Sequence, residues 1–293
     1  MKRFGIASLV FALSASLTAV TQGQLFEGDG SGVFTNQVIN SSGTNPGNTT
    51  ANWQSVWDDI DNGNGPTGLL GSGNYNIINH AIDTENYFDY AGGGWFNSPP
   101  TLNNNTINSD GPGGGGGPIS NGDNYSVRGQ TILEFTVGGT YTIGMASDDG
   151  RTIKLTEALP GSAPGYSGFD AANGQGPEFS GAGDTEIGFS GGTGHNDTRG
   201  RFTVAAGDFL ALDAFYYEGG GGDSGEIAIF QGDGLFSAGQ LANDGFVILQ
   251  DGAFGAINLH SSIQAVPEPA SIAIWTLLGL SLCGFGYYRL RRK

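Results

Sequence analysis

The chain has 293 residues, of which 54 are glycine, and its 28 acidic residues against 11 basic ones give a formal net charge of −17. Nucleic-acid binding needs a positive surface, so a balance this acidic excludes that class of function. No Gly-X-Y period runs through the chain, which excludes collagen, and an aromatic content of 11% predicts a folded core instead of general disorder.

The first 23 residues have the pattern of a secretory signal peptide. Lys2 and Arg3 provide the positive start, residues 4–20 are mostly apolar, and small residues follow at Thr21 and Gly23. A permanent membrane anchor fits less well, because this stretch is short and serine and threonine interrupt it. We therefore predict an N-terminal signal helix that is removed by cleavage after Gly23, leaving the body of the protein outside the cytoplasm.

Residues 24–66 form a segment rich in glycine and asparagine that we expect to precede the main domain. Its one dense apolar cluster consists of Trp53, Val56, Trp57 and Ile60. Spacings of three and four residues are those of an α-helix, so we predict one or two helical turns that end at Asn62-Gly63.

We predict one large β domain over residues 67–258. Residues 97–123, where a run of glycines stands between two prolines, are predicted to be a surface insertion or a flexible linker. Apolar residues alternate on both sides of Gly138-Gly139, which we expect to join two strands as a hairpin. Further strands are predicted at 151–155, 201–205, 209–217, 226–231 and 246–249. Short strands with glycine-rich connections indicate an all-β fold, an antiparallel β-sandwich with long loops.

The run Gly-Thr-Tyr-Thr-Ile-Gly-Met-Ala-Ser-Asp-Asp-Gly-Arg at 139–151 resembles the signature of the anthrax-protective-antigen-type (PA-fourteen-like) domain, which reads roughly G-x-Y-x-F-x-x-x-S-D-D-G. Residues 206–220 and 226–230 are similar to later strands of that family. One departure is that Lys-Leu-Thr-Glu-Ala at 154–158 replaces the family's L-x-I-D-G element. The resemblance implies a β-sandwich of the kind found in toxins, glycosidases and yeast adhesins.

In the adhesin members, adjacent aspartates joined by a cis peptide hold a calcium ion that also ligates sugar hydroxyls, and Asp148 and Asp149 match these two positions. Neighbours on an extended strand point to opposite faces, so aiming both carboxylates at one ion needs an unusual backbone. The resemblance implies Ca2+ as a cofactor. The alternative, that Asp-Asp-Gly only turns one strand into the next, stays open.

Other oxygen ligands for such a site can be named only as candidates, since no motif fixes them. They are Glu157, Asn196, Asp197 and Glu218. Two aromatic residues, Trp95 and Tyr217, are candidates for stacking on sugar rings if they are exposed.

Patterns that would indicate an enzyme are weak. Gly-Phe-Ser-Gly-Gly at 188–192 matches a nucleophile elbow by its letters, but Gly-Thr-Gly-His follows it where the elbow needs a helix. His80, His195 and His260 lack metal-ligand spacing, and Asp59–Gly65 lacks two ligands of a calcium loop. We therefore predict a protein that is not an enzyme, with a glycan-active hydrolase as the less favoured alternative.

After a linker at 259–265, the chain continues with Val-Pro-Glu-Pro, an uncharged apolar run at 271–288 and a basic cluster. The run is long enough to cross a membrane, and the basic cluster would hold its end in the cytoplasm, so we predict a transmembrane helix at 271–288. Residues 266–293 closely resemble the PEP-CTERM sorting signal of Gram-negative bacteria. The residues that carry the resemblance are Pro267, Glu268, Pro269, Arg289, Arg291 and Arg292.

The sorting-signal resemblance implies an exosortase-type membrane protease as a partner, which cuts near the triplet and delivers the protein to the cell surface or an exopolysaccharide matrix. A plain C-terminal anchor is the alternative. The single cysteine, Cys283, lies in the apolar run, so the exported body lacks disulfides and thiolate sites. We expect an exported surface or matrix protein that binds an extracellular polysaccharide or other glycan, or else a structural matrix protein without a specific ligand.

Overall fold

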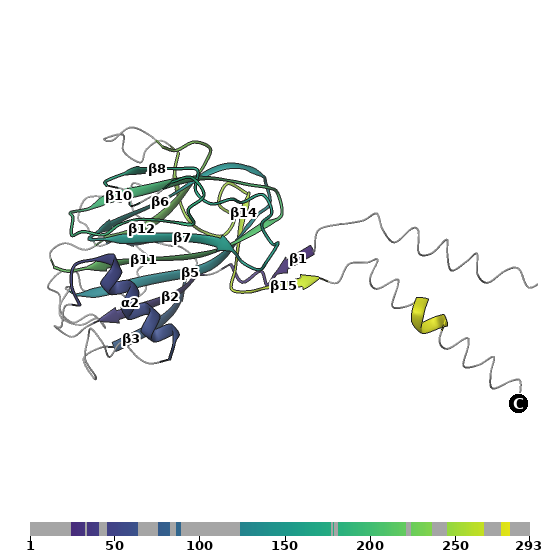
Figure 1. Cartoon of the computed structure of the whole chain (residues 1–293), viewed down its shortest axis with the longest axis horizontal. Helices are drawn as coiled ribbons and strands as arrows, with labels where there is room; N and C mark the ends of the chain where they lie inside the picture. Colours follow the sequence, from purple (N-terminus) through teal and green to yellow (C-terminus); the bar gives the residue numbers. More distant parts are fainter. Residues whose placement is uncertain are drawn as a thin grey trace, which may run out of the picture. The chain divides into compact units, whose positions relative to one another are not determined.

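The computed structural model describes residues 25–32, 34–40, 46–63, 76–82, 86–88, 124–176, 178, 181–220, 224–235, 245–266 and 277–281. The chain forms two compact units, Glu27–Gln264 and a second one made of Met1–Phe26 with Ala265–Lys293. Strands β1 (Leu25–Gly28) and β15 (Ile263–Val266) pair with each other. All other elements below belong to the larger unit (Figure 1).

Two antiparallel sheets make up the larger unit. The seven-stranded sheet has the order β3-β2-β5-β11-β7-β9, and β14 also pairs with β5. Its strands are β2 (Phe34–Asn40), β3 (Asn76–Ile82), β5 (Tyr125–Phe135), β7 (Arg151–Glu157), β9 (Glu186–Phe189), β11 (Asp208–Glu218) and β14 (Ile257–His260). The six-stranded sheet has the order β13-β12-β6-β10-β8, with β4 paired to β12. Its strands are β4 (Asn86–Phe88), β6 (Gly139–Asp148), β8 (Ala171–Gly174), β10 (Asn196–Val204), β12 (Ser224–Gln231) and β13 (Val247–Ile248).

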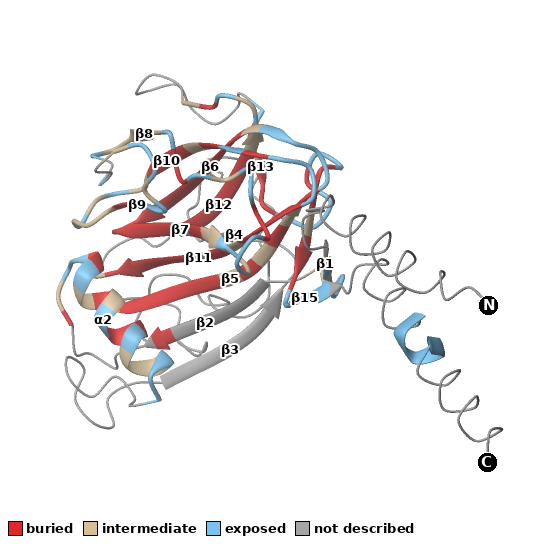
Figure 2. Ribbon diagram, turned by 45° about the vertical axis from the view of Figure 1, so that its right-hand side comes forward, coloured by how far each residue is buried: buried red, intermediate tan, exposed pale blue. Residues whose placement is uncertain are grey.

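The main core lies between the two sheets and is formed by side chains of the central strands, among them β5, β6, β7, β10, β11 and β12. Leu133, Leu155 and Leu212 come from the seven-stranded sheet, and Ile143 and Ile229 come from the six-stranded one, all of them buried. Figure 2 shows β5, β7 and β11 of one sheet and β6 and β12 of the other as mainly buried. This arrangement confirms the predicted all-β antiparallel sandwich.

Aromatic residues fill one part of this core. The ring of Phe202 lies at 5.8 Å from Phe135, 6.2 Å from Tyr141 and 6.0 Å from Phe169, measured between centroids. Two of these three pairs, those with Phe135 and Phe169, meet edge to face, which is a favoured geometry for aromatic rings. The aromatic content noted in the sequence therefore serves the core of the sandwich.

The predicted helix forms as α2 (Thr50–Asp61), whose 12 residues make it longer than the one or two turns predicted, and it ends at Asn62, as expected. Thr49 caps its start, because its side chain accepts the N–H of Asn52 at 3.2 Å. The helix buries Trp53 and Trp57 in a second apolar cluster with residues of β2 and β11. Because β2 also pairs with β5, this part of the chain is integral to the sandwich, which begins before the predicted boundary at residue 67.

The predicted hairpin at Gly138-Gly139 is wrong, although both of its strands exist. β5 lies in the seven-stranded sheet and β6 in the six-stranded one, so the turn carries the chain from one sheet to the other. Alternation of apolar residues shows which side chains face the core but not which strand is the hydrogen-bonding partner. The turn requires glycine, since a Cβ on Gly138 would lie 2.8 Å from the main-chain nitrogen of Ala206.

The other predicted strands are confirmed as β7, β10, β11, β12 and β13, and most of them are longer than predicted. Within the described residues, no helix is long and apolar enough to cross a membrane. The predicted signal peptide at 1–23, the predicted insertion at 97–123 and the predicted sorting triplet at 267–269 lie outside the described residues. Of the predicted transmembrane segment 271–288, only 277–281 is described, and it is helical.

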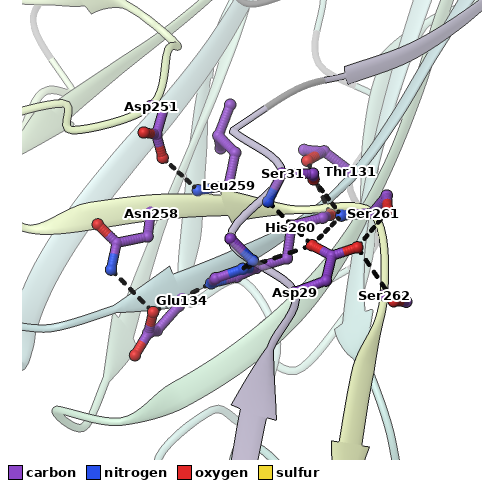
Figure 3. A network of polar contacts seen from close by, with 11 residues as sticks. Asp29, Ser31, Thr131, Glu134, Asp251, Asn258, Leu259, His260, Ser261 and Ser262 are labelled. Atoms are coloured by element: carbon purple, nitrogen blue, oxygen red, sulfur yellow. Dashed lines mark hydrogen bonds and ion pairs between the residues drawn. The ribbon is translucent and has the colours of Figure 1, made fainter.

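A polar network holds the entry and the exit of the larger unit side by side (Figure 3). Asp29 accepts the N–H of Ser261 at 3.0 Å, and the hydrogen bond from the Ser261 hydroxyl is the main cause that holds the pKa of Asp29 well below its usual range. His260 Nδ1 accepts the N–H of Gly30 at 2.8 Å, and its Nε2 lies 3.0 Å from Glu134 Oε2. Since His260 pairs with Ile132 near the end of β5, the network marks that end of the sandwich.

Candidate metal and ligand site

Three buried carboxylates meet at the opposite end of the sandwich. Asp148 ends β6, Asp149 follows it in the turn to β7, and Glu218 ends β11. One oxygen from each of these residues lies within 4.8 Å of the others, and the exposed fractions are 7%, 8% and 0%. The peptide bond between Asp148 and Asp149 is cis. We call these three residues the three-carboxylate cluster.

The turn between β6 and β7 is fixed on the end of β11. Asp149 donates its N–H to the carbonyl of Tyr217 at 3.0 Å, and Tyr217 donates its N–H to the carbonyl of Gly150 at 3.0 Å. A Cβ on Gly150 would lie 2.4 Å from the Tyr217 ring and 2.9 Å from the carbonyl oxygen of Phe189. This close approach requires glycine, and it places Glu218, the residue after Tyr217, beside the two aspartates.

The side chain of Asp149 connects two loops. Its Oδ1 accepts the N–H of Thr193 at 2.7 Å from the β9–β10 loop, and its Oδ2 accepts the N–H of Gly219 at 2.9 Å from the loop after β11. Glu218 Oε1 accepts the N–H of Gly220 at 2.5 Å. Main-chain donors therefore hold two of the three carboxylates in place, and the loops that provide these donors form the rim of the site.

Burial sets the charge of the groups around the cluster. The pKa of Arg151 is lowered to about 10 by burial, against the opposing charge of Asp197, so the guanidinium is charged at neutral pH. The pKa of His195 is lowered to about 4 by burial and by the charge of Arg151, so this imidazole is neutral at pH 7. Burial, followed by the charges of Asp149 and Glu218, raises the pKa of Tyr217, whose hydroxyl donates to the carbonyl of Ser190 at 2.8 Å.

The donor atoms of the cluster fit a calcium ion. Ca2+ binds oxygen ligands at about 2.3–2.6 Å, so two ligands of one ion lie at most about 5 Å apart. The separation limit of 4.8 Å within the cluster agrees with that geometry. A set made only of carboxylate oxygens suits a hard cation better than zinc, which prefers imidazole and thiolate ligands. Three carboxylates this close also repel one another, which a bound cation would relieve.

The structure places the candidate site residues in different surroundings. Asp148, Asp149 and Glu218 come together, whereas Trp95 lies outside the described residues. The suggestion that Tyr217 is an exposed platform for sugar rings is wrong. Its side chain is fully buried and stacks on Trp53 at 6.1 Å with 16° between the ring planes. A ring enclosed on both faces has no surface for a sugar.

The other candidate oxygen ligands make contacts elsewhere. Glu157 ends β7 at the far side from Arg151 and accepts the N–H of Gly161 at 2.9 Å. Asp197 forms a buried ion pair with Arg199, and Asn196 accepts the N–H of Asp197 at 2.9 Å. Within the described part of the chain, the set of acidic residues that can share one ion does not include Glu157 or Asp197.

The region that matches the nucleophile elbow by its letters is part of the rim of the site. Ser190 Oγ accepts a hydrogen bond from Thr50 Oγ1 at 3.2 Å, and the Ser190 carbonyl accepts the hydroxyl of Tyr217. Thr193, the residue whose N–H holds Asp149, follows in the same loop, and its Oγ1 donates to Gln175 Oε1 at 2.8 Å. These contacts give the serine a role in fixing a loop.

No protein-family model matches the sequence, and no curated protein matches it. Among solved structures, the PA14 domain of the MpAFP antifreeze protein is 13% identical with a TM-score of 0.43, and the match covers 78% of this chain and 89% of that one. The PA14 sugar-binding domain from an RTX adhesin is 18% identical with a TM-score of 0.28, covering 46% and 55%.

A third solved structure is the Epithelial Adhesin 9 A domain from Candida glabrata in complex with Galb1-3GlcNAc. It is 9% identical with a TM-score of 0.37, and the match covers 78% of this chain and 94% of that one. The identities and the TM-scores are low throughout. The fold assignment therefore depends on the strand topology of this chain alone.

Proposed function

We propose that the protein is an exported carbohydrate-binding protein of the cell surface or extracellular matrix, which holds a calcium ion at the three-carboxylate cluster. The observation that carries the proposal is the meeting of Asp148, Asp149 and Glu218 within 4.8 Å at one end of the sandwich. The cluster combines buried negative charge with a rim of loops, and both are needed for a cation that also contacts a ligand.

A calcium ion at this position would leave room for sugar hydroxyls. Ca2+ takes about six to eight oxygen ligands, and three carboxylates supply fewer unless all of them bind through both oxygens. Both oxygens of Asp149 also accept main-chain N–H groups, which restricts how that carboxylate can turn toward an ion. Hydroxyl groups of a polysaccharide are suitable neutral oxygens for the remaining positions, so calcium would link protein and glycan.

The position of the three-carboxylate cluster in the fold supports a site that is accessible to a ligand. Tyr125 at the start of β5 pairs with Glu218, and Phe135 at its end pairs with Ile257 of β14. A strand of 11 residues at about 3.3 Å per residue separates the two ends by roughly 30 Å. The site and the chain ends of the larger unit thus lie at opposite ends, which leaves the site free for a ligand when the chain ends are attached.

Export and sorting complete the proposal. The signal-like start at 1–23 would direct the chain across the inner membrane, and the segment 266–293 would hold it there until an exosortase-type protease releases it. A strongly acidic body suits a hydrated extracellular matrix, because 27 acidic residues between 24 and 265 face five basic ones, a net charge of −22.

Calcium removal tests the site directly. Chelation with EGTA is expected to lower the melting temperature and to abolish signals on a glycan array. Ligand at about a hundred times its Kd stabilises by about 2.7 kcal/mol, or roughly 5 to 10 °C for a domain of this size. Asp149→Asn should lose both effects, whereas Asp233→Asn, an exposed acid that pairs with Arg201, should keep them.

A structural matrix protein without a ligand would show neither a calcium-dependent melting temperature nor a glycan signal, and that result would refute the proposal. Glycan signals that are equal for wild type and Asp149→Asn would show that the cluster is not the binding site. Release of reducing sugar from a polysaccharide by the protein would indicate the hydrolase alternative.

A further inference from the structure

Arg151, the first residue of β7, is a fully buried charged side chain that lies against the turn carrying the two aspartates. Its Nη1 is 3.4 Å from the carbonyl oxygen of Asp149 and 3.4 Å from Ser147 Oγ. Its Nε donates to Thr198 Oγ1 at 3.1 Å. Its Nη2 has no hydrogen-bond partner within the described part of the chain.

Packing alone does not explain an arginine at this position. The guanidinium packs against the ring of Phe189 at 5.4 Å and is surrounded by the sandwich interior. A buried charge has a large desolvation penalty, and an apolar side chain of similar volume, such as methionine, would fill the same space without it. What methionine lacks is the set of donors that reach the Ser147–Asp149 turn.

The main-chain carbonyl of Asp149 accepts hydrogen bonds from two side chains, those of Arg151 and Ser147. Ser147 Oγ also donates to the carbonyl of Asp149 at 2.8 Å, so Ser147 and Arg151 hold the same oxygen. The carboxylate of Asp149 points away to Thr193 and Gly219. A residue whose carbonyl and carboxylate are both fixed has little freedom to rotate, and the direction of its carboxylate is set.

We propose that Arg151 is a positioning residue of the cation site: it holds the Ser147–Asp149 turn from the interior so that the carboxylates of Asp148 and Asp149 meet Glu218. The inference depends on the proposed function, because it assigns Arg151 to the same site. In this proposal Arg151 does not contact the cation. It acts on the main chain of Asp149, and the side chain of Asp149 is the group that contacts the cation.

The charge and the donors of Arg151 have opposite effects on cation affinity, which makes the proposal testable. Removing a positive charge near a cation site strengthens cation binding by Coulomb's law. Releasing the turn weakens it, and loss of an outer partner of a metal ligand usually reduces affinity about ten- to a hundredfold. If positioning dominates, Arg151→Met binds calcium more weakly despite the lost positive charge.

The experiment is a calorimetric titration of the full-length protein with Ca2+. We expect Arg151→Met to weaken calcium binding about ten- to a hundredfold and Arg151→Lys to weaken it less, since lysine keeps donors but cannot reach both acceptors. Lys154→Met is the matched control, because it removes an exposed positive charge from the same strand without touching the turn. Its calcium affinity should stay within about twofold of wild type.

Unchanged or tighter calcium binding by folded Arg151→Met would overturn the proposal, as would an equal loss in Lys154→Met. If Arg151→Met does not fold, Arg151→Lys and Ser147→Ala decide in its place, because each removes only part of the contact to the Asp149 carbonyl. Absence of calcium binding by the wild-type protein would refute the proposed function itself. Binding by the wild type with no effect of these variants would refute only the role of Arg151.

Discussion

At the scale of single residues, burial decides which groups near the three-carboxylate cluster carry charge. Arg151 keeps its charge at neutral pH, while His195 and Tyr217 are neutral there. His195 lies in the rim loop, two residues beyond Thr193, and the charge of Arg151 opposes its protonation. The three acidic side chains of the cluster therefore carry the negative charge of the site, while the neighbouring His195 and Tyr217 are neutral at pH 7.

The buried imidazole of His195 predicts a specific pH dependence of stability. Its pKa is 6.5 in an unfolded chain and about 4 in the folded protein. Between these values the unfolded chain takes up a proton that the folded protein does not, so His195 makes the folded state less stable as the pH falls. Above pH 6.5 it has no such effect.

Urea unfolding of wild type and His195→Gln from pH 8 to pH 4 checks this prediction. The free energy of unfolding of the wild type should fall more steeply below pH 6.5 than that of the variant, whereas the difference between them should be constant above it. A difference that stays the same over the whole range would contradict a lowered pKa for His195.

The residue-level prediction from sequence reached only part of the site. Asp148 and Asp149 were predictable because the Ser-Asp-Asp-Gly motif that contains them is defined by the types of its side chains, which the sequence shows directly. Thr193 and Gly219 were not, because each acts through its main-chain N–H, and any residue except proline has that group. Tyr217 was misjudged because its position, one residue before Glu218, says nothing about the tryptophan that covers it.

At the scale of elements, helix α2 is joined to the seven-stranded sheet by an ionic contact as well as by its tryptophans. Arg128 of β5 is buried and pairs with Asp61 at the end of α2 at 2.8 Å and with Asp213 of β11. Its guanidinium also packs on the ring of Trp57 at 5.6 Å. One side chain therefore links the helix and two central strands.

Arg128→Ala is expected to destabilise the protein by about 2 kcal/mol, because the variant loses the charge-assisted hydrogen bonds of a buried guanidinium to Asp61 and Asp213 and its packing on Trp57. Arg201→Ala is the matched control. Arg201 also pairs with two partly exposed aspartates, Asp170 and Asp233, but its own side chain is 30% exposed against 5% for Arg128, so the loss should be below about 1 kcal/mol. Thermal melts of both variants give the comparison, and equal losses would contradict a special role for burial.

The strands β5 to β7 and β10 to β13 were predictable from the sequence, but their pairing was not, and the other described strands were not predicted. The segments of β5 and β6 that flank Gly138-Gly139 alternate clearly, whereas β8 (Ala-Ala-Asn-Gly) is too short and too rich in small residues to be recognised. The hairpin at Gly138-Gly139 failed because a glycine turn between two alternating segments fits a hairpin and a change of sheet equally well. α2 was correct as a helix, and only its contacts across the sheet show that it belongs to the sandwich.

At the scale of the whole molecule, the larger unit places the three-carboxylate cluster and its own chain ends at opposite ends of β5. A binding domain that is attached through its chain ends would then keep its site accessible.

Replacing the sorting triplet by Pro267→Ala, Glu268→Ala and Pro269→Ala is expected to keep the protein uncut in the membrane fraction of its host. The reason is that the proposed protease reads the triplet before it cuts. Cell fractionation with mass spectrometry of the C-terminus measures the outcome, and Pro160→Ala in the body of the protein is the control. Normal release of the triple variant would indicate that the triplet is not the recognition element.

The neighbouring chain ends of the larger unit have a further consequence. Asp29 donates its N–H to the carbonyl of Ser262 at 3.1 Å, and Gly32 donates to the carbonyl of Leu259 at 3.0 Å, so the two ends run side by side. Paired segments of this kind are about 5 Å apart. The unit is therefore suited to insertion as a whole domain into an exposed loop of a carrier protein. Its two ends are so close together that the two halves of the interrupted loop would need to separate only slightly.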